Sequence, residues 1–139
     1  MKISSYLNFD GTCEAAFKFY EATLGGKISA MMPFGSTPAC DHVPESHRDK
    51  IMHARITVGD QELMGSDCIP AHPYEGIKGC SVSLQLNDVG ESKRIFKALS
   101  ENGIIEMPLQ ETFWAARFGM VKDQFGVPWM VNCEQASAK

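Results

Sequence analysis

The sequence predicts an α+β fold built from two βαβββ modules that follow one another along the chain. Three observations support this prediction. The same order of strand and helix patterns recurs at an offset of about 77 residues, although sequence identity between the halves is weak. Several strand-like segments alternate between apolar and polar residues. Both helix-like segments begin near a capping residue and end at a glycine, so their limits are marked in the sequence.

The first module is expected over residues 1–69. A strand from Ile3 to Phe9 precedes Thr12, which is a suitable N-cap for a helix. The apolar stripe of that helix comprises Cys13, Ala16, Phe17, Tyr20 and Leu24, and Gly25-Gly26 ends it. Three further strands are predicted at 27–34, 51–58 and 61–67, with a long polar loop at 35–49 and a tight turn at Gly59-Asp60.

The second module is expected over residues 79–134, after a linker at 70–78, and residues 135–139 form a tail. Asp88 and Glu91 have the spacing of a capping box for its helix, which Asn102-Gly103 ends. The inner stripe of that helix comprises Ser92, Ile95, Phe96 and Leu99. Strands are predicted at 80–86, 104–109, 115–122 and 127–133. We expect the whole chain, 1–139, to form a single domain.

Composition and charge exclude several function classes. The chain has 139 residues and a net charge of -4, and its Lys and Arg residues form no basic stripe, which argues against a nucleic-acid partner. Its apolar runs are far shorter than the roughly 20 residues of a membrane helix, and no signal peptide is recognisable, so no membrane partner and a cytoplasmic location are expected. The five cysteines lack a CxxC pair, which favours reduced thiols.

The strand patterns predict one apolar and one polar face for each sheet. In the strand at 80–86, Val82, Leu84 and Leu86 alternate with Ser81, Ser83 and Gln85. The strands at 51–58 and 127–133 alternate in the same way. The apolar faces are expected to pack on the helices. Alternation alone leaves open whether the polar faces line a concave ligand cleft or simply contact water.

Several segments resemble the PhnB-like proteins of the glyoxalase/bleomycin resistance/dioxygenase superfamily, also called vicinal oxygen chelate. The resemblance is carried by Glu111–Gly119, Asp123–Asn132, Tyr6–Gly11, and the Phe19-Tyr20 pair followed by Gly25-Gly26. It implies a glyoxalase-like fold of paired βαβββ modules, an unknown small-molecule partner bound in a cleft between the two half-sheets, and a homodimer. The family is also often described as resembling a demethylubiquinone methyltransferase, but this chain lacks a glycine-rich turn after a strand.

The same resemblance implies four positions at which superfamily enzymes hold a divalent metal with His, Gln or Glu. In this sequence those positions hold Ser5, Met64, Ser81 and Met130. Hydroxyl and thioether groups are poor ligands for such ions, and a register shift that brings in Glu62 or Gln85 still leaves the set incomplete. We therefore expect no metal site and no cofactor.

Other residue groups each allow two interpretations. Asp41, His42, Glu45 and His47 form either a solvated loop or a metal site. Arg55 and Glu62 form either an ion pair across a hairpin or a ligand contact. Trp114, Arg117, Phe118 and Trp129 belong either to the core or an interface, or to a ligand site. The candidate residues of the ligand cleft are Ser5, Leu7, His53, Arg55, Glu62, Met64, Ser81, Ser83, Gln85, Trp114, Arg117, Met130 and Asn132.

The sequence thus favours a small-molecule-binding protein that lacks the metal of its superfamily. Two alternatives remain open, a metal-dependent lyase, isomerase or dioxygenase and, with less support, a methyltransferase. No nucleophile–histidine motif is recognisable. The sequence therefore leaves undecided whether the chain is an enzyme, and it identifies no catalytic residue.

Overall fold

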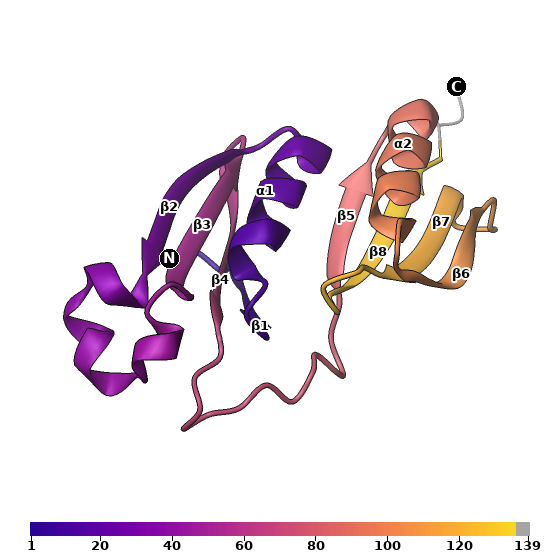
Figure 1. Ribbon diagram of the computed structural model, residues 1–139. Helices are drawn as coiled ribbons and strands as arrows, with labels where there is room; N and C mark the ends of the chain where they lie inside the picture. The colour runs from indigo at the N-terminus through magenta and orange to yellow at the C-terminus, as the bar shows by residue number, and fades with distance from the viewer. Residues whose placement is uncertain (136–139) are drawn as a thin grey trace. The chain divides into compact units, whose positions relative to one another are not determined.

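The computed structural model describes residues 1–135 and divides the chain into two compact units, Met1–Gly76 and Ile77–Lys139. The boundary between them lies within residues 70–78. Each unit contains one helix and one four-stranded sheet (Figure 1). That the two units form one domain stays a prediction. Of the expected tail, residues 136–139 lie outside the described residues.

The first unit contains β1 (Ser5–Phe9), α1 (Cys13–Leu24), β2 (Lys27–Pro33), β3 (Ile51–Val58) and β4 (Gln61–Asp67). Its strand order is β1-β4-β3-β2. The β1–β4 pair is parallel and the other pairs are antiparallel, so the first and last strands of the unit lie side by side. The loop after β2 contains three short 3₁₀ turns, at Phe34–Ser36, Pro38–His42 and Glu45–His47.

The second unit repeats this topology with β5 (Val82–Leu86), α2 (Val89–Ser100), β6 (Ile104–Gln110), β7 (Ala115–Lys122) and β8 (Pro128–Glu134). Its strand order is β5-β8-β7-β6, and the β5–β8 pair is again parallel. The predicted pair of βαβββ modules is therefore confirmed. The constant offset holds from β1 to β2, but it shrinks at β3 because the long loop has no counterpart in the second unit.

Each unit has its own apolar core between its helix and one face of its sheet. In the first unit Phe17 and Tyr20 of α1 and Ile56 of β3 are fully buried, and in the second unit Leu99 of α2 and Trp129 of β8 are buried likewise. All four predicted inner residues of α2 are buried. In α1 the last buried position is Thr23, and the expected Leu24 is only half-buried.

The start of α1 lies where the sequence predicted it, but a different side chain makes the capping contact. Thr12 is the N-cap residue of α1, as expected, although its side chain makes no capping bond. The backbone nitrogen of Cys13 donates instead to Asp67 Oδ1, which reaches the helix from the end of β4. The start of α2 agrees with the prediction, because the Asp88 carboxylate accepts a hydrogen bond from the backbone nitrogen of Glu91. The αL conformation of Gly25 ends α1 as expected.

Strand limits also differ slightly from the predictions. β1 begins at Ser5 instead of Ile3, and β5 begins at Val82, which leaves Ser81 just outside the strand. β8 is shifted by one residue, since it runs from Pro128 to Glu134. All five cysteines are free. Within residues 1–135, no helix is long and apolar enough to cross a membrane.

Candidate functional site

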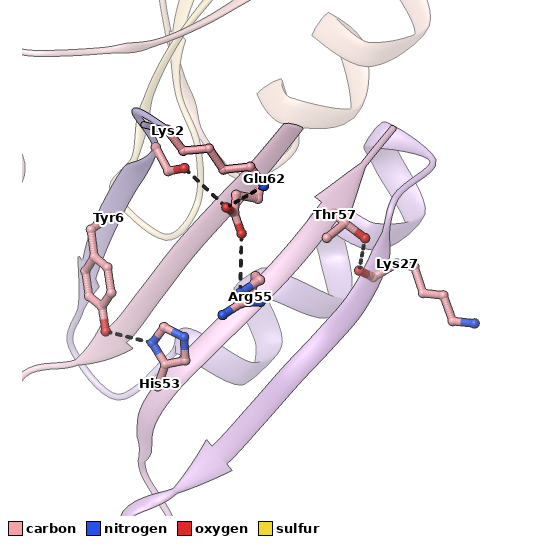
Figure 2. Close-up of polar contacts among 8 residues, drawn as sticks. Lys2, Tyr6, Lys27, His53, Arg55, Thr57 and Glu62 are labelled. Carbon is pink, nitrogen blue, oxygen red and sulfur yellow. Dashed lines mark hydrogen bonds and ion pairs between the residues drawn. The ribbon is translucent and has the colours of Figure 1, made fainter. Parts of the chain in front are cut away.

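In the first unit, strand pairing decides which side chains share the face of the sheet that points away from α1, here called the helix-distal face. Tyr6 pairs with Met64, and Met64 pairs with Arg55, so these three side chains lie in one row across β1, β4 and β3. By the same alternation His53 and Glu62 lie on that face (Figure 2). The structure therefore brings together four of the predicted cleft candidates, His53, Arg55, Glu62 and Met64, and adds Tyr6 to them.

The Glu62 carboxylate is the centre of a charged cluster on this face. Its side chain is only 13% exposed, and Oε2 lies 3.3 Å from Arg55 Nε. Oε1 accepts from Lys2 Nζ at 3.4 Å and from Ser4 Oγ at 3.5 Å. Figure 2 shows the cluster above β3 and β4. The ion pair between Arg55 and Glu62 is thus confirmed, and this carboxylate is already surrounded by donors.

Beside this cluster, Tyr6 and His53 form a second polar contact. The Tyr6 hydroxyl lies 3.2 Å from His53 Nδ1, and the two rings stack with centroids 5.8 Å apart and planes inclined by 29° (Figure 2). Tyr6 was absent from the predicted site residues. Its alternation with the buried Leu7 and Phe9 is the sequence signal that assigns it to this face.

Two predicted cleft residues lie on the other face of the first sheet. Leu7 is 6% exposed and belongs to the core, and it pairs with Gly65 beneath the ring of Phe17 of α1. Ser5 has the same parity as Leu7 and pairs with the buried Leu63. The prediction that Ser5 and Leu7 line the polar face is therefore wrong. β1 places Tyr6 on the helix-distal face, and Ser5 and Leu7 lie on the opposite face.

The helix-distal face of the second sheet holds a chain of uncharged polar groups. Gln85 pairs with Asn132 and Ser83 pairs with Met130, which places all four on the same face. Asn132 Nδ2 donates to Gln85 Oε1 at 2.8 Å, and Gln85 Nε2 donates to Ser83 Oγ at 2.7 Å. Asn132 Oδ1 is buried and has no hydrogen-bond partner within the described part of the chain.

The orientation of the two amides does not remove this unpaired atom. If both amide groups are reversed, Gln85 Nε2 donates to Asn132 Oδ1, and Asn132 Nδ2 becomes the buried group without a partner. A buried amide atom without a partner costs about 1–3 kcal/mol. A hydroxyl group, which both donates and accepts, satisfies Asn132 in either orientation.

Aromatic side chains flank Asn132. Phe118 of β7 pairs with Asn132 and is 8% exposed, and the half-exposed Trp114 packs edge-to-face on it with centroids 5.4 Å apart. Arg117 pairs with the buried Cys133 and donates to the Ala116 carbonyl, so it lies apart from this group.

Trp129 lies in the core of the second unit and not at this site. Its indole Nε1 donates to Asp123 Oδ2 at 2.8 Å, and Asp123 Oδ1 accepts from the backbone nitrogens of Phe125 and Val127. The sequence predicted strands on both sides of residues 123–126, but nothing in it indicated that Asp123 is buried.

The residues at the four superfamily metal positions do not fit a divalent ion. Ser5 and Met64 belong to the first unit, and Ser81 and Met130 belong to the second. These side chains offer hydroxyl and thioether groups, whereas zinc, nickel and magnesium favour imidazole and carboxylate, and Ser5 has the parity of the core face. Among residues 1–135, no group of three or more His, Cys, Asp or Glu is arranged to hold a metal, the loop with His42 and His47 included.

Comparison with known proteins places this architecture in a family. The family model of the Glyoxalase/Bleomycin resistance protein/Dioxygenase superfamily matches residues 2–131. Protein YjdN of Escherichia coli (strain K12) is 38% identical over 95% of each chain. The crystal structure of protein PA1353 from Pseudomonas aeruginosa is 54% identical, covers 98% of this chain and 99% of its own, and superposes with a TM-score of 0.91.

A further solved structure supports the predicted resemblance to PhnB-like proteins. It is described as a putative 3-demethylubiquinone-9 3-methyltransferase, PhnB protein, from Bacillus cereus, and it is 25% identical over 96% of this chain and 99% of its own, with a TM-score of 0.80. Proteins of this superfamily bind small molecules. Because the family model covers nearly the whole sequence, this chain belongs to the Glyoxalase/Bleomycin resistance protein/Dioxygenase superfamily.

Proposed function

We propose that this protein binds a small organic molecule at the helix-distal face of its second sheet without the help of a divalent metal. The observation that carries the proposal is the buried amide of Asn132, which has no partner for one of its atoms among residues 1–135. A ligand group that pairs with this atom removes a cost of about 1–3 kcal/mol that the free protein carries.

The neighbours of Asn132 indicate the chemical class of the ligand. Phe118 and Trp114 offer an apolar and aromatic surface next to the amide. Ser83 and Gln85 extend the hydrogen-bonding row along β5. A planar or apolar molecule that carries a hydroxyl group has the features that this surface recognises.

The helix-distal face of the first unit carries a binding group of its own. Arg55 contacts Glu62 through Nε, and among the described residues its two Nη groups have no ion-pair partner. A guanidinium group with free Nη atoms binds carboxylates in a bidentate manner. Within the first unit, Arg55 therefore attracts a carboxylate, whereas the Glu62 carboxylate repels it.

A ligand screen with a matched variant tests the proposal. We expect hydroxylated aromatic compounds to raise the melting temperature of the purified protein. Asn132→Ala should lower the affinity for the best compound by about tenfold, as the loss of one buried hydrogen bond implies. Gln124→Ala, at an exposed turn position, should leave affinity unchanged. If the Asn132→Ala and Gln124→Ala variants bind the compound with equal affinity, the proposal that Asn132 contacts the ligand loses its main support.

The same ligand screen distinguishes this proposal from the alternative of a metal-dependent enzyme. Ligand affinity should be the same in the presence of EDTA and after addition of Zn²⁺, Ni²⁺ or Mn²⁺, because hydroxyl and thioether groups occupy the metal positions. Ligand binding that requires one equivalent of a divalent ion would instead support a metalloenzyme of this superfamily.

We also propose that the two units form one domain, and that the protein is a cytoplasmic homodimer. Each sheet has two edge strands without a partner inside that sheet, β1 and β2 in the first and β5 and β6 in the second, and a second copy can cover such edges. Sedimentation equilibrium should give twice the chain mass, and urea should unfold the chain in one transition. Cell fractionation checks the cytoplasmic location. A monomeric mass would contradict the homodimer, and two separate unfolding transitions would contradict the single domain.

A further inference from the structure

The second unit contains a groove on the helix side of its sheet, between α2 and the edge strand β6. Its volume is about 380 Å³, and it is widely open to solvent. The proposed function makes no use of this groove, since the polar row of Ser83, Gln85 and Asn132 lies on the opposite face of the sheet. The groove is lined by Lys93, Phe96, Lys97, Ser100, Ile105 and Leu109.

Helical spacing explains why these residues face one another. Lys93, Phe96, Lys97 and Ser100 follow the i, i+3, i+4, i+7 pattern and form one stripe along α2. On β6, Ile105 pairs with the buried Val121 and therefore lies on the helix side of the strand. The adjacent Ile104 pairs with Lys122 and lies on the other side.

A glycine of β7 lies against Phe96, which lines the groove. A Cβ atom at Gly119 of β7 would lie 2.7 Å from Phe96 Cε1 and 3.0 Å from the backbone of Leu109. Because Gly119 has no side chain, the ring of Phe96 packs directly on β7, and the backbone of Leu109 in the neighbouring strand lies close to it. Phe96 is 6% exposed, whereas Ile105 at the rim remains 51% exposed. The groove thus has an apolar floor and one apolar wall.

The other wall carries two positive charges that are not neutralised within the described residues. Lys93 and Lys97 are exposed and lie one helical turn apart, and neither forms an ion pair with another described side chain. The nearby Glu91 is engaged by Arg94. Like charges at i, i+4 repel each other, so an anion placed between the two ammonium groups is stabilising.

We propose that this groove binds an amphipathic carboxylate. The carboxylate lies between Lys93 and Lys97, and an aliphatic or aromatic body lies over Phe96, Leu109 and Ile105. The charge of the two lysines selects the anionic head, and the apolar floor requires a hydrophobic body. A small polar anion gains nothing from that floor.

An NMR titration with three matched probes tests this site. Octanoate, octanol and octylamine share one apolar body and differ in the charge of the head group. Octanoate is expected to shift backbone amide signals of residues 93–100 and 104–110, octanol to shift them more weakly, and octylamine to leave them unchanged. Asn132→Ala should give the same octanoate titration as the unmodified protein, which separates this site from the proposed function.

Variants of the lysines and of the rim complete the test. Lys93→Gln combined with Lys97→Gln should lower the affinity for octanoate by about tenfold, as the loss of two exposed ion pairs implies. The affinity for octanol should stay unchanged. Ile105→Asp should abolish octanoate binding, because it places a carboxylate on the apolar rim. Ile104→Asp is the matched control, since Ile104 is 63% exposed and does not line the groove.

Three results would overturn the proposal that this groove binds an amphipathic carboxylate. If octanoate, octanol and octylamine bind alike, the lysine pair does not select an anion. If the shifted signals belong to Ser83, Gln85 and Asn132, the probe occupies the helix-distal face and not this groove. If Ile104→Asp and Ile105→Asp weaken octanoate binding equally, Ile105 makes no contact of its own with the probe, and the apolar rim is not part of the site.

Discussion

The backbone nitrogen of Cys13, the first residue of α1, donates a hydrogen bond to Asp67 Oδ1 at 2.9 Å, although the two residues lie 54 positions apart. The second oxygen, Oδ2, accepts from the backbone nitrogen of Ile51 at 2.8 Å. Asp67 is 3% exposed, so both bonds lie in the interior. One carboxylate at the end of β4 therefore fixes both the start of α1 and the start of β3.

Removal of this carboxylate should destabilise the first unit strongly. Asp67→Ala leaves two buried N–H groups without acceptors, and we expect a loss of about 2–4 kcal/mol in the free energy of unfolding, measured by urea denaturation. Thr12→Ala is the matched control, because Thr12 makes no capping bond, and it should change stability by less than about 0.5 kcal/mol. A large loss for Thr12→Ala together with a small loss for Asp67→Ala would contradict this assignment.

The thiol of Cys13 should make stability depend on pH in the alkaline range. Burial, and after it the charge of Asp67, raises the pKa of the Cys13 thiol above its ordinary value. The unfolded chain therefore releases this proton first, so stability is at its full value below the ordinary thiol pKa and falls as pH rises above it. Urea denaturation between pH 7 and pH 10 should show this fall, and Cys13→Ser should reduce it.

Reaction of the thiols with a disulfide reagent checks the same environment. Cys80 is exposed and should react fastest at pH 8, whereas Cys13 and Cys133 are buried and should react only on unfolding. The pKa of Cys68 is also raised, first by burial and then by Asp10 and Asp67, so Cys68 should react more slowly than Cys80. Modification of Cys13 at the rate of Cys80 would contradict the buried position.

Divalent metals should not stabilise the protein. An ion present at a hundred times its dissociation constant adds about 2.7 kcal/mol to the free energy of unfolding, and Zn²⁺, Ni²⁺ and Mn²⁺ should each fail to produce such a shift. Differential scanning calorimetry with and without EDTA provides the measurement. One divalent ion per chain in protein purified without chelators would show that the metal positions are not those of Ser5, Met64, Ser81 and Met130.

Two glycines of the second unit should respond oppositely to a methyl group. Gly119→Ala places a Cβ 2.7 Å from Phe96, which must move, and overpacking of this kind costs about 1–3 kcal/mol. Gly90 lies in the first turn of α2, where a Cβ meets only Asp88 Oδ2 at 3.4 Å. Gly90→Ala should therefore stabilise the helix by up to about 1 kcal/mol, as thermal unfolding will show. Stabilisation by Gly119→Ala would disprove the close contact with Phe96.

The repeated topology could be predicted because each of its signals is local. Strand alternation around Leu84 and Ile56, the Asp88 cap and the glycine after Leu24 all act over a few residues, and the structure has these elements where the patterns indicated them. The family resemblance agreed with them. Strand ends were less accurate, because the pairing of β1 with β4, and not the residues of β1 themselves, decides where β1 begins.

The features that could not be predicted depend on contacts between distant residues. Thr12 occupies the N-cap position of α1 as predicted, yet the carboxylate that accepts from the first backbone nitrogen of the helix belongs to Asp67 at the end of β4. Ser5 and Leu7 were placed with the polar residues because the alignment to metal positions set their parity, whereas the buried contacts of β1 set the opposite parity. The burial of Asp123 and the unpaired amide of Asn132 likewise arise only once the second sheet is assembled.

The parallel pairing of β1 with β4 has a consequence for the order in which the chain matures on the ribosome. Both the strand partner of β1 and the carboxylate that caps α1 are supplied by the last strand of the first unit. The N-terminal half of that unit therefore cannot reach its final structure until residue 67 has left the exit tunnel. From then on every hydrogen bond of the first sheet can form, while the second unit is still being synthesised.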